Sequence, residues 1–497
     1  MVQSATKYQL KAMKKEIERI NVGIKGLRTF FKSNQNQFMV DYVLHSSTII
    51  VDANNVLYKL YDTCSGSNAA FGCDYHLVYS HFVEFCSLFD TCNVKPIMVF
   101  DGGLDFDNRK EMTREIRTKK RMATGIYCNP SRQERLNVLP LFGTHIFTAV
   151  CKKHNYQVVQ CDYEADDEIA LLSSILNCPV LSGDSDFFIF GIELILYNPP
   201  SVSFSFIKVN GKRAIFCKMF CTDRFLKEYG SLPRSHLPLV GILLGNDYVH
   251  LESSQKVWSG KVMSKEEGIM DTHRRIKKVT SRLRGQIIKS ALEEILSTVP
   301  HNKKEEVRKL IEYSLRRDRE IQHGKGVSLV TKILDETEHD TAIYSKNNNP
   351  LPQWFSTAYR NCNFPSRILH IICNHKFHHL AQVEKESRPY SLFSAIDIFR
   401  AFSAILLSVD YPDISLLGSD SAETVEIELG VRVGRKLEQW TVPFYNNGSQ
   451  RVPQLRDIPE LSFRVRLAFF NDVLKIDETS VGITDLFPDN FKLFICS

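Results

Sequence analysis

The sequence predicts an α/β protein in which a parallel sheet is flanked by helices, followed by a mainly α-helical C-terminal region. Thr48 to Val51 and Pro96 to Phe100 are continuous apolar runs, as expected of buried parallel strands. Between them, residues 77–89 repeat apolar side chains at helical spacing. The order strand, helix, strand is typical of a parallel sheet that is covered on both faces. Each run leads into an aspartate, Asp52 after the first and Asp101 after the second.

A third apolar run, Tyr156 to Gln160, precedes a helix that is predicted from its apolar periodicity. Glu164, Asp166 and Asp167 follow this run, and we expect them in the first turn of the helix. The helix dipole favours acids there by only about 0.3–1 kcal/mol each. That effect accounts for one or two acids better than it accounts for a cluster.

A fourth run, Pro179 to Leu181, is followed by Asp184 and Asp186. Alternate residues of an extended segment point the same way, so we expect these two carboxylates to aim together. A later apolar stretch, Leu239 to Leu244, leads to a further acid, Asp247.

The carboxyl ends of the strands in an open parallel sheet line one crevice, where ligands bind. We therefore expect eight carboxylates at this edge: Asp52, Asp101, Glu164, Asp166, Asp167, Asp184, Asp186 and Asp247. Carboxylates in one site repel unless cations hold them, and oxygen ligands suit magnesium, manganese or calcium better than zinc. Acids after strands also form turns and caps, which explains either motif alone equally well. The complete set favours a metal site.

The composition is that of a globular protein, with 43% hydrophobic and 24% charged residues, and 497 residues allow two to four domains. The first twenty residues carry charges throughout and lack the apolar stretch of a signal peptide. No membrane span is visible, so we expect an intracellular protein, nuclear or cytoplasmic, without a membrane partner. Its 13 irregularly spaced cysteines favour reduced thiols over a disulfide framework.

The chain is expected to have five parts. Residues 1–21 form an N-terminal extension, 22–250 the α/β domain, 251–338 a basic helical region, 339–352 a linker with an Asn-rich run, and 353–497 the mainly helical C-terminal region. Within the α/β domain, Asn210-Gly211 predicts a two-residue turn in a hairpin from Phe204 to Cys217.

Two basic stretches, residues 105–135 and 272–289, are candidates for binding nucleic acid, because each neutralised phosphate strengthens salt-sensitive binding. The candidate residues are Arg109, Lys110, Arg114 and Arg117 in the first stretch and Arg274, Lys278 and Arg282 on one face of a helix in the second. Ordinary solvated helices remain the alternative for both stretches.

The motifs VDANN, FDGG, YEADD, SGDSD and LLGNDY, preceded by GIKGL, resemble those of the flap endonuclease/XPG family of metal-dependent nucleases, which has a PIN-like fold. The resemblance covers about residues 22–248. The hairpin and the C-terminal part are similar to the asteroid branch of this family. So is the absence, after Tyr248, of the glycine-bearing element with which the family usually binds duplex DNA.

The resemblance implies a role for each acid. It assigns catalysis and metal binding to Asp52, Asp101, Glu164, Asp166, Asp184, Asp186 and Asp247, and makes Asp167 an additional or outer acid. It implies two Mg²⁺ or Mn²⁺ ions about 4 Å apart. It also implies a helical arch over residues 105–140, in which Lys110 and Arg117 have the family's seven-residue spacing and Arg109 and Arg114 are alternates.

The implied function is a metal-dependent, structure-specific endonuclease that hydrolyses DNA phosphodiester bonds at single-strand/duplex structures in DNA repair. The missing duplex-binding element predicts a preference for single-stranded ends or flaps. RNA is an alternative substrate that the metal-site motifs do not exclude. A different class of function is a catalytically weak or inactive asteroid-type scaffold, signalling or RNA-binding protein, because a fold does not establish activity.

Overall fold

The computed structural model describes residues 24, 26–64, 72–103, 117–119, 121–122, 124–125, 138–197, 204–245, 258, 269–323, 330, 342–378, 387–411, 426–433, 436–443 and 452–473. The chain divides into two units. The first comprises Met1–Glu338 with Ala381–Val383, and the second comprises His339–Leu380 with Glu384–Ser497.

The first unit contains an eight-stranded sheet. Seven strands follow the order β1-β8-β6-β5-β2-β3-β4, and the eighth, β7, pairs with β8. The strands are β1 (Met39–Leu44), β2 (Thr48–Asp52), β3 (Lys95–Phe100), β4 (Gln157–Gln160), β5 (Val180–Ser182), β6 (Leu194–Leu196), β7 (Ser205–Val209) and β8 (Lys212–Phe220). Strands β6, β5, β2, β3 and β4 pair in parallel. Four of them, β2, β3, β4 and β5, form where the sequence predicted strands, and β6 was not predicted. Strands β1 and β7 pair antiparallel with β8. The β7–β8 hairpin was predicted, whereas β1 and the pairing of β8 with β6 were not.

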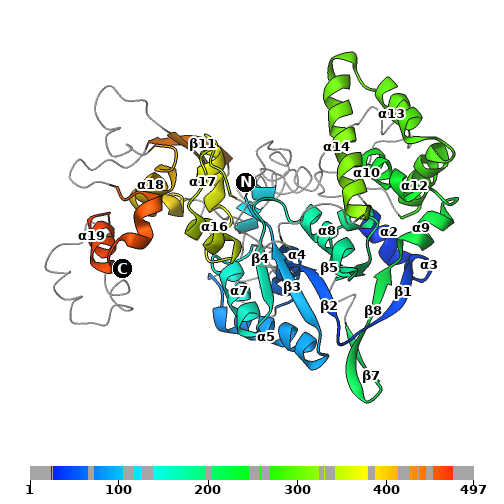
Figure 1. Cartoon of the computed structure of the whole chain (residues 1–497), viewed down its shortest axis with the longest axis horizontal. Helices are drawn as coiled ribbons and strands as arrows, with labels where there is room; N and C mark the ends of the chain where they lie inside the picture. Colours follow the sequence, from blue (N-terminus) through cyan, green and yellow to red (C-terminus); the bar gives the residue numbers. More distant parts are fainter. Residues whose placement is uncertain are drawn as a thin grey trace, which may run out of the picture. The chain divides into compact units, whose positions relative to one another are not determined.

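Helices cover both faces of this sheet (Figure 1). The helices described in the first unit are α2 (Leu27–Ser33), α3 (Gln35–Phe38), α4 (Ala53–Thr63), α5 (Tyr75–Thr91), α7 (Gly143–Lys153), α8 (Asp166–Leu176), α9 (Thr222–Glu228), α10 (Leu237–Leu244), α12 (Ile269–Leu283), α13 (Ile288–Ser297) and α14 (Lys304–His323), with short 3₁₀ turns η3 (Asp186–Phe188), η4 (Arg234–His236) and η5 (His301–Lys303).

The alternation of side chains along the central strands explains why both faces are covered. Ile50 and Ile97 are neighbours across β2 and β3, and both belong to the core that α8 and α10 share. On β3, Phe100 packs instead against Phe147 of α7, with ring centroids 6.1 Å apart. Phe147 also meets Phe82 of α5, at 5.0 Å. A strand that is buried on both faces must be apolar at every position, which is the pattern that identified β2 and β3.

The hairpin β7–β8 turns at the predicted residues. Asn210 and Gly211 have φ angles of 51° and 79°. Positive φ at both central positions is the requirement of a type I′ turn, and Asn-Gly meets it at low steric cost. The prediction of this hairpin is confirmed.

The helices of the basic region, α12, α13 and α14, belong to the first unit and share its core. Ile276 of α12, Ile295 of α13 and Ile311 of α14 lie in the same apolar cluster as Leu243 of α10 and Leu172 of α8. Helix α14 packs along α8 and α10. The acidic motif at the start of α8 therefore has a neighbour that is distant in the sequence.

The second unit is built from α16 (Gln353–Arg360), α17 (Ile368–Asn374), α18 (Ile396–Leu407), α19 (Phe463–Val473), η7 (Ser391–Ala395), η9 (Leu455–Glu460), β9 (Lys376–His378), β10 (Glu426–Val433) and β11 (Lys436–Pro443). Its three strands form a sheet of order β11-β10-β9, which our expectation of a mainly helical region did not include. Residues 342–352 were expected to lie in a linker. Instead, Ile343 and Leu351 are buried in the core of this unit.

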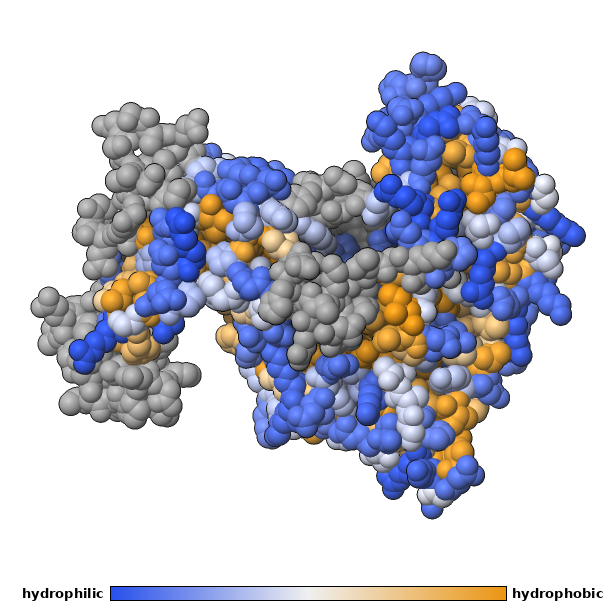
Figure 2. All heavy atoms as spheres, viewed as in Figure 1, coloured by the Kyte–Doolittle hydropathy of each residue, from blue (hydrophilic) through white to orange (hydrophobic). Residues whose placement is uncertain are grey.

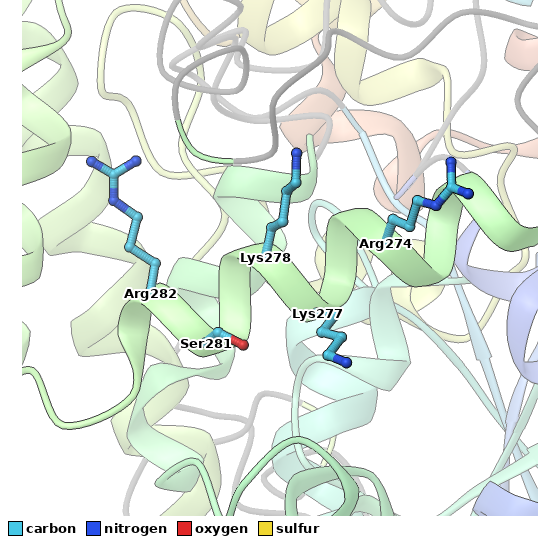
Figure 3. A pocket seen from close by; sticks show the side chains of 5 residues that line it. All are labelled: Arg274, Lys277, Lys278, Ser281 and Arg282. Carbon is cyan, nitrogen blue, oxygen red and sulfur yellow. The ribbon is translucent and has the colours of Figure 1, made fainter.

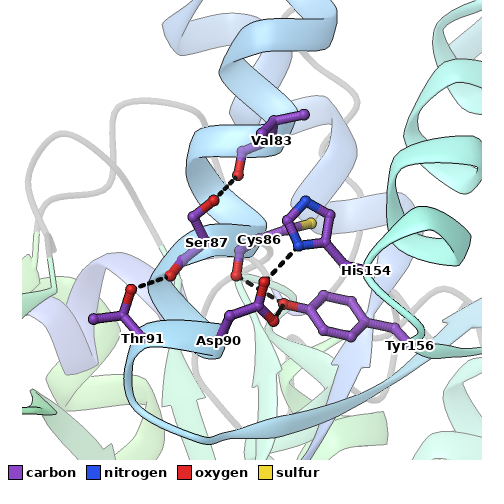
Figure 4. Close-up of polar contacts among 7 residues, drawn as sticks. All are labelled: Val83, Cys86, Ser87, Asp90, Thr91, His154 and Tyr156. Carbon is purple, nitrogen blue, oxygen red and sulfur yellow. Dashed lines mark hydrogen bonds and ion pairs between the residues drawn. The ribbon is translucent and has the colours of Figure 1, made fainter.

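A polar cluster joins three elements at the amino ends of β3 and β4 (Figure 4). The Tyr156 hydroxyl, just before β4, donates to Asp90 Oδ1 at 2.6 Å and to the Cys86 carbonyl at 2.7 Å, both on α5. His154, after α7, contacts the other oxygen of Asp90. Burial and the Asp90 hydrogen bond raise the pKa of Tyr156 far above its usual range. The cluster fixes the edge opposite to the predicted acids.

The cysteines that the structure describes are free thiols, in agreement with the prediction of a reduced chain. Among the described helices, none has both the length and the apolar content that a membrane span needs.

Candidate active site

Four neighbouring parallel strands, in the order β5-β2-β3-β4, end at one edge of the sheet of the first unit. Asp52 is the last residue of β2, Asp101 follows β3 directly, and Asp184 follows β5 by two residues. Glu164 lies in the loop between β4 and α8. The predicted convergence of these segments at the carboxyl edge is therefore the observed topology.

Asp52 is the most enclosed of these acids, with 7% of its surface exposed. Its Oδ2 accepts a hydrogen bond from the Ser182 hydroxyl at 2.7 Å, and its Oδ1 accepts one from the Asn55 N–H at 3.1 Å. Burial raises the pKa of Asp52 well above its usual range, and the charges of Asp101 and Asp166 raise this pKa further. The two hydrogen bonds act in the opposite direction. Asp52 thus lies among like charges that oppose its ionisation.

Asp101 is held by backbone contacts between the loops after β3 and β4. Its Oδ1 accepts from the Ala165 N–H at 3.1 Å, while its own N–H donates to Asn54 Oδ1 at 3.3 Å. The next N–H, that of Gly102, donates to the Tyr163 carbonyl at 2.6 Å. A Cβ at Gly102 would come within 1.9 Å of the Cys161 carbonyl oxygen, so only glycine permits this close approach. The FDGG motif fixes the aspartate by joining two loops.

The SGDSD motif forms a compact turn instead of the extended segment that we expected. The Asp184 N–H donates to the Ser182 hydroxyl at 3.0 Å, and the Asp186 N–H donates to Asp184 Oδ1 at 3.2 Å. Asp186 is buried and begins η3. The expectation that alternation along a strand aligns Asp184 and Asp186 was wrong, because a side chain that accepts from the backbone two residues on favours a turn over a strand.

Gly183 lies between these serine and aspartate residues at a second close approach. Its N–H donates to Asn55 Oδ1 at 2.9 Å. A Cβ at this position would lie 2.6 Å from the Tyr197 carbonyl oxygen. The loop after β5 is thus fixed against both the VDANN motif and the end of β6.

The YEADD motif begins α8, with Asp166, Asp167 and Glu168 in its first turn. Glu164 precedes the helix by two residues, which corrects our expectation that it lies in the first turn. Asp166 interacts electrostatically with Asp52. Asp167 instead forms an ion pair with Arg317 of α14, whose Nη1 lies 3.3 Å from its Oδ1. The two adjacent aspartates of the motif therefore have different surroundings.

The structure brings Asp52, Asp101 and Asp166 into electrostatic contact, while Asp247 lies outside the described residues. Within the described part of the chain, no three His, Cys, Asp or Glu side chains are arranged as ready-made metal ligands. The donor chemistry nevertheless fits Mg²⁺ or Mn²⁺, since it consists of carboxylate oxygens. Burial and then the charges of Asp101 and Asp166 raise the pKa of Asp52, and a bound cation would relieve the repulsion among these charges.

Sequence reasoning missed the polar residues that support the acids, namely Asn54, Asn55 and Ser182. It also missed Arg28, whose pKa burial lowers and the charge of Asp184 raises. The asparagines were visible in the VDANN motif. Asn-Asn after a strand reads as a turn, however, and only the tertiary fold shows that each side chain accepts from a different neighbouring loop.

The basic residues of α12 line a shallow open pocket of about 570 Å³, together with Lys277 and Ser281 (Figure 3). Figure 3 shows Arg274, Lys278 and Arg282 projecting from the same side of the helix, as their spacing predicted. Arg274 is 74% exposed and lies 3.5 Å from Asp271.

Arg282 differs from the other two bases because its guanidinium contacts neighbouring side chains of the protein. Its Nε donates to Glu294 Oε1 at 2.6 Å, and its guanidinium lies 4.5 Å from the centre of the Trp258 ring. Arg274 and Lys278 are therefore the better candidates for phosphate contacts. Of the other predicted bases, Arg109, Lys110 and Arg114 lie outside the described residues, and Arg117 lies in a described helical segment, residues 117–119.

Comparisons with known proteins agree with this arrangement. Residues 22–124 match the XPG N-terminal domain. The chain is 28% identical over 402 residues to "Single-strand DNA endonuclease ASTE1" of Danio rerio, which covers 78% of this chain and 54% of that protein. It is 26% identical over 492 residues to the Homo sapiens protein of the same name, covering 95% of this chain and 68% of that one. The chain thus spans about half the length of the Danio relative.

Among solved structures, the catalytic core of Rad2 in complex with DNA substrate is 14% identical, with a TM-score of 0.34, and the match covers 64% of this chain and 100% of that one. The predicted fold class, a PIN-like α/β sheet of the XPG/flap endonuclease type with a largely helical C-terminal region, is confirmed. The predicted resemblance to asteroid proteins is confirmed by these two relatives and by "Protein asteroid" of Drosophila melanogaster, which is 25% identical over 334 residues, covering 57% of this chain and 38% of that protein.

Proposed function

We propose that this chain is a divalent-metal-dependent endonuclease that hydrolyses phosphodiester bonds in DNA, with single-stranded ends or flaps as its substrates. The single observation that carries the proposal is the convergence of the acid-bearing segments after β2, β3, β4 and β5 at one edge, where Asp101 and Asp166 act on buried Asp52. A structural role would not require like charges to be held together against their repulsion.

The residues have distinct tasks in this proposal. Asp52, Asp101 and Asp166 hold Mg²⁺ or Mn²⁺, with Glu164, Asp184, Asp186 and Asp247 as further ligands. When bound, such ions lower the pKa of an attacking water and stabilise the departing oxygen of a phosphodiester. Ser182 and Asn55 orient Asp52 through their hydrogen bonds. Asn54 and Gly102 fix the backbone at Asp101 relative to the neighbouring loops. Hydrolysis by this route needs no covalent intermediate.

The substrate assignment rests on two features. The relatives are named single-strand DNA endonucleases. The pocket of α12 supplies cations that contact phosphates without reading sequence. The sequence after Tyr248 lacks the glycine-bearing element with which the family usually binds duplex DNA. The basic helix α12 alone is better suited to a splayed single strand than to a continuous duplex.

The test is a cleavage assay on end-labelled single-stranded DNA, a 5′ flap, blunt duplex and single-stranded RNA, each with Mg²⁺ or with EDTA. We expect Mg²⁺-dependent cutting of the single-stranded and flap DNA and little cutting of blunt duplex. Cutting that persists in EDTA, or no cutting of any substrate, would contradict the proposal. RNA cut faster than DNA would reassign the substrate.

A catalytically weak scaffold is the second candidate. It is favoured by one observation: no three acids in the described residues stand in ligand geometry. The same assay separates the two functions, because a scaffold binds the single-stranded DNA, measured by fluorescence anisotropy, without cutting it.

A further inference from the structure

We propose that Arg317 of α14 is a positioning residue for the acidic site, holding the start of α8 and the segment after Asp186 in their mutual arrangement. This inference rests on the proposed nuclease function and deepens it. It assigns a role in catalysis to a helix that supplies none of the predicted metal ligands.

Arg317 contacts the YEADD motif directly and the segment after the SGDSD motif through an aromatic ring. Its Nη1 lies 3.3 Å from Oδ1 of Asp167, the neighbour of Asp166 in the first turn of α8. Its guanidinium carbon lies 5.0 Å from the ring centre of Phe190, four residues after Asp186. Phe190 in turn meets Phe187, the residue next to Asp186, with ring centroids 5.8 Å apart. One side chain thus connects the YEADD and SGDSD motifs.

Arg317 is itself fixed in place. Only 13% of its side chain is exposed, and its Nε donates to Asp318 Oδ1 at 3.0 Å. The Asp318 side chain is 3% exposed. A guanidinium offers donors in a rigid planar fork and a flat face for stacking, so it can engage two carboxylates and a ring together, which a lysine cannot do. Arg317 contacts all three groups, namely the carboxylates of Asp167 and Asp318 and the ring of Phe190.

The pair that Arg317 forms with Asp318 is buried, whereas the Asp167 side chain is 36% exposed. A buried ion pair contributes little net stability compared with apolar residues of the same volume, because both charges lose water. Such a pair is more informative about specificity of arrangement. Here the pair with Asp318 fixes the guanidinium of Arg317, and with it the contacts of Arg317 to Asp167 and Phe190.

Helix α14 also supplies a matched control. Its outer side is hydrophilic (Figure 2), and Arg319 lies exposed two residues from Arg317. Arg317→Met and Arg319→Met remove the same group from the same helix. Arg317→Lys keeps the charge beside Asp167 and Asp318 but loses the fork and the stacking surface, and it provides a variant that retains the buried charge should Arg317→Met fail to fold.

The experiment measures two properties of the full chain. The first is kcat and KM on single-stranded DNA with Mg²⁺. The second is the Mn²⁺ concentration that gives half-maximal thermal stabilisation of the protein without DNA. We expect Arg317→Met to lower kcat by about 10–100-fold and to raise the Mn²⁺ midpoint by about 10-fold, the usual effect of losing an outer partner of metal ligands, with KM unchanged. Arg317→Lys should show a smaller loss, and Arg319→Met should match the wild type.

The other outcomes contradict either the role of Arg317 or the nuclease function. Equal kcat and equal Mn²⁺ midpoints for Arg317→Met and Arg319→Met overturn the inference while leaving the nuclease intact. A rise in KM with kcat and the Mn²⁺ midpoint unchanged overturns it as well, since it would make Arg317 a DNA contact. If Arg317→Met does not fold, wild-type values for Arg317→Lys overturn it. A wild type that neither cuts nor responds to Mn²⁺ overturns the proposed function and this inference together.

Discussion

At the scale of single residues, the acids could be predicted from the sequence but their supporting partners could not. An aspartate at the end of an apolar run is a local signal, and so are paired acids before a helix. The hydroxyl that donates to Asp52 belongs to Ser182, 130 residues away in the sequence. The ion-pair partner of Asp167 is Arg317, on a helix far along the chain. Such contacts depend on which strands and helices become neighbours, which no local pattern specifies.

The buried carboxyl of Asp318 is expected to make the stability of the protein depend on pH. Burial raises its pKa to about 6, although the Arg317 charge and hydrogen bond lower it. A folded-state pKa above that of the unfolded chain means that the folded state binds the proton more tightly. The stabilisation from Asp318 protonation is therefore fully present below pH 4 and is lost as the pH rises through about 6.

We expect the free energy of unfolding of the wild type, relative to Asp318→Asn, to increase by about 1 kcal/mol between pH 7 and pH 5. The measurement is urea unfolding of both proteins without divalent ions at the two pH values. Glu320→Gln, an exposed acid on the same helix, is the control. A difference between wild type and Asp318→Asn that stays constant with pH would show that Asp318 is already ionised at pH 5.

At the scale of elements, the sequence predicted best those segments whose own chemistry determines their shape. Strands β2 and β3 were identified from continuous apolar runs, and the β7–β8 hairpin from Asn-Gly. The turn η3 was missed because Asp184 captures the Asp186 N–H. The C-terminal sheet was missed because β9 has only three residues and β10 carries a glycine in its centre and an arginine near its end. Pairing with neighbours, and not local preference, makes these segments strands.

The basic residues of helix α12 are expected to bind the phosphates of DNA. Arg274→Glu with Lys278→Glu should weaken binding to single-stranded DNA and to flaps alike, because phosphate contacts carry no sequence information. The salt dependence should become shallower, by a slope of about 0.7 for each lost contact with a single strand. The position of the cut should stay the same.

The measurement is the dissociation constant by fluorescence anisotropy at several salt concentrations, with the cleavage products mapped on a gel. Lys303→Glu with Lys309→Glu changes the same charge at exposed positions of η5 and α14 and serves as the control. Equal affinity losses for the two double variants would mean that net charge alone governs binding and that the α12 pocket has no special role.

At the scale of the whole molecule, the boundary near residue 338 separates two units with their own cores. The sequence indicated a change of character there from the Asn-rich run. It could not show that residues 342–352 belong to the second core, because Ile343 and Leu351 are isolated apolar residues in a polar context. It also treated 251–338 as a separate region, whereas α12, α13 and α14 complete the core that supports the acids.

The proposed function requires that the acids at the carboxyl edge of the sheet in the first unit form one metal-dependent catalytic site. The most direct measurement compares Mg²⁺-dependent cleavage of single-stranded DNA by the wild type, Asp101→Asn and Asp184→Asn, together with the melting temperatures of the metal-free proteins. Glu84→Gln is the matched control, since its side chain is 78% exposed on α5. We predict that both aspartate variants lose cleavage while Glu84→Gln retains it. Because removing one charge relieves the repulsion on Asp52, Asp101→Asn should also be at least as stable as the wild type without metal, with an equal or higher melting temperature. Equal turnover in the wild type and both aspartate variants, from preparations free of other nucleases, would contradict the claim.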